Sequence, residues 1–142
     1  MRRRLFLLSA MVATRAPADT AQELIAVFAA MAAALSEDNP NVFLRSIDPR
    51  MPGYGQFAAN LRALSAQNTL ASSIELLSQE GGDAAQSVEL EWLLEIRGRE
   101  QSRIFVRRQS VVKCRLEREK KSWRVVALEP AAFFAPPSPS EK

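Results

Sequence analysis

Apolar residues along this chain change their spacing near residue 70. Before that point they recur every three or four residues, which is helical spacing, and after it they alternate with polar residues or form longer runs. The first of these patterns predicts a helix over residues 20–35. Its apolar stripe consists of Leu24, Phe28, Met31 and Leu35.

Two more helices are predicted before residue 70. Asn39 and Pro40 favour the start of a short helix, because Asn caps helix N-termini and the missing N–H of proline costs nothing at the first position. Residues 48–53 form a loop, since two prolines and a glycine in six residues interrupt a helix. A third helix is expected over residues 54–67. The apolar sides of these two helices are Phe43, Leu44, Ile47, Phe57, Leu61 and Leu64.

Four strands follow, over residues 70–79, 86–97, 103–117 and 123–129. The second strand has the clearest alternation, which is typical of a half-buried antiparallel strand. We therefore predict an α+β fold, with two to three N-terminal helices packed on a curved four-stranded antiparallel sheet. The apolar face of the second strand consists of Val88, Leu90, Trp92, Leu94 and Ile96.

The first eighteen residues have the layout of a bacterial export signal. Three arginines precede a short apolar run, and Ala16-Pro17-Ala18 offers a cleavage signal before Asp19. Arg3-Arg4-Leu5-Phe6-Leu7 also resembles the core of the twin-arginine signal, and a general export signal is the alternative. The run is too short to span a bilayer, so we expect a periplasmic or secreted protein without a stable membrane anchor.

Charge outside this leader is nearly balanced. The whole chain carries +3, with 19 basic and 16 acidic residues, but four arginines and no acid lie in residues 1–18. The remainder is therefore close to −1, which argues against a nucleic-acid partner, because phosphate binding needs a surplus of basic charge. Residues 19–134 suffice for one domain, and residues 135–142 are expected to be a disordered Pro/Ser tail.

Several kinds of chemistry are excluded by composition. The chain has no His and a single cysteine, Cys114, so neither an internal disulfide nor a zinc site of standard type can form. Catalysis by Ser-His-Asp or Cys-His is excluded as well. We expect no cofactor and no metal, and we expect Cys114 to be buried and inert.

One position on the predicted inner face of the sheet is charged. Pairing the second strand with the third so that Ile96 faces Ile104 puts Trp92 opposite Arg108 and leaves Ser110 beside them on the apolar face. Arg108 and Ser110 would then sit in a cavity walled by Trp92 and orient an acidic or carbonyl group. The alternative, favoured because bulges are common in long strands, is a bulge that turns Arg108 outward.

Three weaker candidates could serve an enzyme. Asp48 could act as a base, although an Asp-Pro pair more often makes a turn. Glu129 ends the last strand and could point inward, and Tyr54, the only tyrosine, could place its phenol at a pocket mouth.

The predicted outer face of the sheet carries acids opposite bases. Such pairs form either a solvated ladder or a polar homodimer surface. Leu93 and Phe105 lie on the same face and favour the dimer, since exposed apolar groups need a cover.

The element order resembles the nuclear transport factor 2-like superfamily, a cystatin-like α+β cone that also includes ketosteroid isomerase and the SnoaL-type cyclases. The segments that carry the resemblance are residues 24–35, 54–67, 88–96 and 123–129. It implies a cone whose mouth opens between helices and sheet, and a dimer formed through the sheet. The isomerases of that superfamily use a carboxylate base with a tyrosine and a protonated acid, and the related cyclases use His and Asp.

Two main functions are compatible with these observations. The first is a binding module for an apolar or acidic small molecule, with a mainly apolar pocket lined by Trp92, Arg108, Ser110 and Tyr54. The second is a small cofactor-independent lyase or isomerase, in which Asp48 or Glu129 is the base and Tyr54 or Arg108 stabilises negative charge. A weaker third is a subunit that only pairs with another protein through its sheet.

Overall fold

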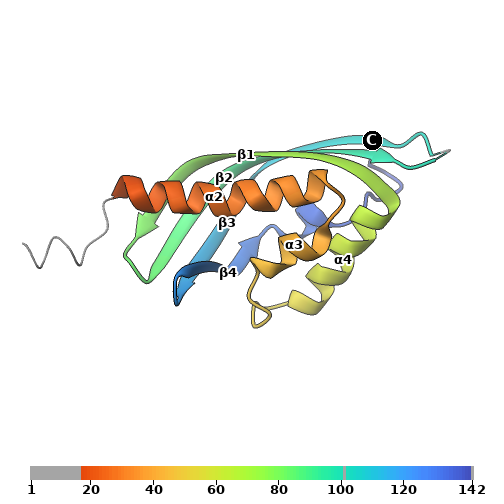
Figure 1. The fold of residues 1–142 in the computed structure, drawn as a ribbon. Coiled ribbons are helices and arrows are strands. Elements are labelled where there is room, and N and C mark those ends of the chain that lie inside the picture. The colour runs from red at the N-terminus through yellow and green to blue at the C-terminus, as the bar shows by residue number, and fades with distance from the viewer. Residues whose placement is uncertain (1–16, 101, 142) are drawn as a thin grey trace, which may run out of the picture.

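A computed structural model describes residues 17–100 and 102–141 (Figure 1). The predicted export signal lies outside this part of the chain except for its last two residues, so export stays a prediction. The helices are α2 (Pro17–Ser36), α3 (Pro40–Arg45) and α4 (Tyr54–Gln67), the strands are β1 (Asn68–Gly81), β2 (Ala85–Gly98), β3 (Phe105–Glu119) and β4 (Ser122–Glu129), and a short 3₁₀ helix, η1 (Ala131–Phe134), follows.

The four strands form one antiparallel sheet in the order β1-β2-β3-β4. In Figure 1 the long strands arch over the helices, which lie together on the concave side. This arrangement confirms the predicted α+β class and the curved sheet. The alternating residues of β2 explain it, because their apolar side is buried against the helices while the other side is half-buried or exposed. The buried side consists of Val88, Leu90, Trp92, Leu94 and Ile96.

Aromatic rings fill the centre of the interior. Trp92 is fully buried, and its ring centroid lies 6.3 Å from that of Phe28, 6.1 Å from that of Phe43 and 5.0 Å from that of Phe134. Its indole Nε1 donates a 2.8 Å hydrogen bond to the hydroxyl of Ser72 on β1, so the one polar atom of the ring is satisfied. Helices, sheet and η1 therefore share a single core.

Helix α2 begins earlier than expected, at Pro17 rather than Thr20. Within this helix the Glu23 carboxylate accepts hydrogen bonds from Trp123 Nε1 at 2.9 Å and Arg118 Nη2 at 3.0 Å. By length and composition Asp19–Ser36 could also span a membrane, yet its apolar stripe is buried in this core.

The register between β2 and β3 differs from the prediction by two residues. Ile96 pairs with Val106 rather than Ile104, and Trp92 pairs with Ser110 rather than Arg108. The connection between the strands, residues 99–104, is longer than predicted. Within it the Arg99 side chain donates to the Ser65 carbonyl and pairs with Asp38.

The outer face of the sheet carries the predicted ladder of opposite charges. Glu95 lies opposite Arg107 and Glu89 opposite Lys113. Phe105 and Val111 are exposed on this face, at 44% and 41%. The homodimer that Leu93 and Phe105 suggested stays a prediction.

Candidate functional site

Arg108 lies on the inner face of β3, near the end of the cone where the chain returns after β4. A shift of two residues keeps the same side chains on each face, so Arg108 remains inward despite the corrected register. The pairing of β2 with β3 is continuous, and bulges occur instead between β1 and β2 and between β3 and β4. The predicted bulge that turns Arg108 outward is therefore wrong. The Arg108 side chain is only 11% exposed.

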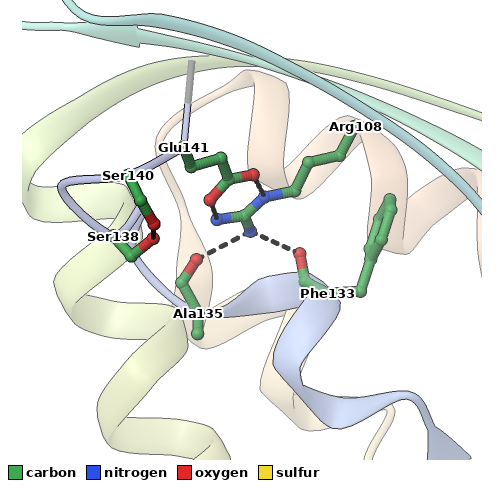
Figure 2. Close-up of polar contacts among 6 residues, drawn as sticks. All are labelled: Arg108, Phe133, Ala135, Ser138, Ser140 and Glu141. Carbon is green, nitrogen blue, oxygen red and sulfur yellow. Dashed lines mark hydrogen bonds and ion pairs between the residues drawn. The ribbon is translucent and has the colours of Figure 1, made fainter.

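The guanidinium of Arg108 is held by the segment that follows β4 (Figure 2). Its Nη1 donates to the carbonyl oxygens of Phe133 at 2.6 Å and Ala135 at 2.7 Å. Its Nε and Nη2 donate to the two carboxylate oxygens of Glu141, at 2.8 and 2.9 Å. Four of the five N–H groups of this side chain are thus engaged, and the two that face Glu141 form a bidentate pair.

The charge of Glu141 follows from this contact. The hydrogen bonds from Arg108 lower the pKa of Glu141, against the opposing effect of partial burial. The carboxylate is therefore ionised at neutral pH and forms a charge-assisted pair with the guanidinium. Arg108 is a carboxylate-binding group in this fold, and the carboxylate that it holds belongs to its own chain.

The segment after β4 is anchored at one end. Phe133 and Phe134 on η1 are buried, and Phe134 reaches Trp92. Residues 138–140 are exposed, whereas Glu141 turns back onto Arg108. The sequence offered one signal for this contact, because it placed the cation of Arg108 on an apolar face without a predicted partner.

A hollow of about 440 Å³ opens beside Glu141, between the start of β3 and the returning tail. Apolar groups dominate its wall, and Arg103 is the one cation among the described residues that line it. The hollow is lined by Arg103, Ile104, Phe105, Ser138, Pro139 and Glu141.

Trp92 is fully buried rather than placed on the wall of an open pocket. Phe134 packs edge-on to Trp92 and occupies the space that the predicted pocket needs. Ser110 is half-buried on the inner face directly opposite Trp92. Of these predicted pocket residues, Arg108 is the one that holds a charged partner.

Asp48 serves the turn between α3 and α4. Its backbone N–H donates to the Val125 carbonyl on β4, and its carboxylate accepts three bonds from Arg50: the backbone N–H at 2.8 Å, Nε at 3.2 Å and Nη2 at 2.8 Å. These bonds to Arg50 lower the pKa of Asp48 to about 2. A carboxylate so strongly stabilised in its charged form is a poor proton acceptor, so the turn is the role that the geometry supports.

Replacing Asp48 with Asn should lower the melting temperature near neutral pH. The folded-state pKa lies below the ordinary value of 3.8, so the stabilisation by this carboxylate is present above about pH 4 and disappears as pH falls toward 2. The difference in melting temperature between wild type and Asp48→Asn should therefore shrink across that interval. An unchanged difference at low pH would show that the carboxylate charge is not what stabilises the turn.

Tyr54 and Glu129 are not brought together with Asp48 into one acid–base site. Tyr54 starts α4 directly after Gly53, whose positive φ of 75° makes the turn, and its side chain packs half-buried against the core. Glu129 is exposed and pairs opposite Lys113 on the outer face of the sheet. The expectation that Glu129 points inward is therefore wrong.

Comparison with known proteins identifies the fold. No protein-family model and no curated protein matches the chain. A conserved protein from Planctomyces limnophilus superposes with a TM-score of 0.69 at 9% identity, over 78% of this chain and 93% of that one. A nuclear transport factor 2-like superfamily protein from Salmonella enterica serovar Typhimurium gives 0.64 at 14% identity, over 80% and 90%.

A hexachlorocyclohexane dehydrochlorinase, LinA type 2, superposes with a TM-score of 0.61 at 10% identity, over 78% of this chain and 82% of that one. At such identities the likeness concerns the fold alone. The chain thus has the nuclear transport factor 2-like fold, as its element order predicted, and this fold includes enzymes as well as proteins of unknown function.

Proposed function

We propose that this protein is a small non-catalytic binding module for an apolar molecule that carries a carboxylate. Arg108 would bind the carboxylate in place of Glu141, and the hollow that Glu141 now lines would receive the apolar part. One observation carries the proposal: the Arg108 guanidinium already holds a carboxylate in bidentate geometry on the otherwise apolar inner face of the cone.

The surroundings of Arg108 support a ligand of this class. A cation on an apolar face is costly unless it is paired, so a partner for Arg108 must be an anion or a set of acceptors. Small-molecule sites typically combine an apolar wall with a few placed polar groups. The hollow of about 440 Å³, with Ile104 and Phe105 on its wall and Arg103 at its edge, has this composition.

The enzyme alternative has weaker support among the described residues. A carboxylate base that works near neutral pH needs a raised pKa and a place facing a cavity. Asp48 has a lowered pKa and is paired with Arg50, and Glu129 is exposed on the outer face. Fold likeness to a dehydrochlorinase does not supply the missing base.

Octanoate should raise the melting temperature of the protein, because a ligand that binds only the folded state stabilises it by mass action. At about 100 times its Kd, octanoate would add about 2.7 kcal/mol, which is on the order of 10 °C for a domain of this size. Octanamide is the matched control, since it keeps the chain length and lacks the charge. An equal shift with octanamide, or no shift with octanoate, contradicts the proposal.

A further inference from the structure

We propose that residues 135–141, termed the strap, are a built-in competitor for Arg108, which closes the site in the absence of an acid and is displaced when one binds. This inference rests on the proposed function of Arg108 as a carboxylate site. It adds that the protein controls access to that site with its own chain.

The strap occupies the donors that an external acid needs. Glu141 takes both Nε and Nη2 of Arg108, while the Phe133 and Ala135 carbonyls take Nη1. With the Arg108 side chain only 11% exposed, no second carboxylate can form the same bidentate pair while Glu141 is in place. Arg108 therefore cannot hold Glu141 of the strap and the carboxylate of a ligand at the same time.

Among the described residues, Arg108 is the main polar anchor of the strap on the domain. The other polar contacts of the strap are local, such as Ser138 to Ser140 and the Glu141 N–H to the Ser138 carbonyl. Residues 138–140 are exposed, in contrast to Phe133 and Phe134, which are 7% and 0% exposed. Segments with few buried contacts open at low free-energy cost. The strap can thus leave Arg108 while its anchor on η1 stays in the core.

Release of the strap also enlarges the space for the ligand. Ser138, Pro139 and Glu141 form one wall of the hollow, and the start of β3 with the two residues before it forms the other. When the strap moves away, this side of the hollow opens and Ile104 becomes more accessible to an apolar chain. The same event therefore frees the donor groups and opens the place for an apolar chain.

Weakening the strap should raise affinity for an external acid, because a closed state that excludes ligand reduces the apparent affinity in proportion to its population. We expect Glu141→Ala to bind octanoate about tenfold more tightly than wild type by calorimetry. Glu141→Gln should show a smaller gain, since its amide oxygen keeps one acceptor. Glu119→Gln, at the distant end of β3, is the matched control and should bind like wild type.

A second readout separates competition from simple loss of negative charge. A fluorescent thiol label on Ser140→Cys reports strap motion, and the native Cys114 is 4% exposed with a thiol pKa that burial raises to about 12, so it reacts slowly. Octanoate should lower the anisotropy of the label, because the displaced strap tumbles more freely.

The outcomes of these experiments distinguish the two proposals. Equal octanoate affinity in wild type and Glu141→Ala overturns the strap as competitor and leaves Arg108 as a binding site. A gain in affinity with unchanged label anisotropy also overturns competition. If octanoate binds neither protein, the proposed function fails and the competitor role fails with it.

Discussion

Replacing Trp92 with alanine is expected to lower the free energy of unfolding by about 3–5 kcal/mol, as truncation of a large buried aromatic residue usually does. Trp92 is fully buried, and its ring packs against Phe28, Phe43 and Phe134 from two helices and η1. Its removal leaves a cavity at the point where these elements meet the sheet and deprives Ser72 of its hydrogen-bond donor. Urea denaturation monitored by circular dichroism measures the change.

A matched control for this experiment is Ile25→Ala. Ile25 is 43% exposed on α2, so its truncation should change stability by no more than about 0.5 kcal/mol. A loss below about 1 kcal/mol for Trp92→Ala would mean that the aromatic interior is loosely packed. The centre of the cone would then already be an open cavity, and Phe134 would not be the group that fills it.

Replacing Arg108 with Met is expected to have the second largest effect, combining a loss of stability with a loss of binding. Met keeps most of the side-chain volume but leaves Glu141 and the carbonyls of Phe133 and Ala135 without their donor. Leaving these acceptors without a donor should lower the free energy of unfolding by about 2–3 kcal/mol in total, because some of them can turn to water instead. The variant should also lose the thermal shift with octanoate.

Arg107→Met is the control for Arg108→Met, because it removes the same charge one residue earlier in β3. The Arg107 side chain is 58% exposed on the outer face, with Glu95 3.8 Å away. Its loss should change stability by at most about 0.5 kcal/mol and leave octanoate binding intact. Equal changes in stability and in octanoate binding for the two variants would show that the position of Arg108 on the inner face does not matter for either.

Much of the fold could be predicted from the sequence because its periodic patterns are strong. The alternation through β2 predicted which side of the sheet faces the interior, and the apolar stripe on α2 predicted the helix that covers this side. The register between β2 and β3 could not be predicted, because registers that differ by two residues keep the same side chains on the inner face. The connection also contains Arg99, whose partners, the Ser65 carbonyl and Asp38, are more than thirty residues away.

The site could be predicted only in part. The pattern placed Arg108 on the inner face in one of its two interpretations, and the structure agrees with that one. Its partner could not be found, because Glu141 lies 33 residues away in a Pro/Ser-rich segment without hydrophobic periodicity. Interpreting Asp48 as a turn residue succeeded, since the Asp-Pro pair has a local physical meaning.

A crystal structure of the complex with octanoate tests most directly whether the guanidinium of Arg108 is a binding site for an external carboxylate. We expect the octanoate carboxylate to accept hydrogen bonds from Nε and Nη2 of Arg108, with Glu141 displaced from them. Octanoate bound elsewhere, with Glu141 still on Arg108 as in Figure 2, would contradict that role for Arg108.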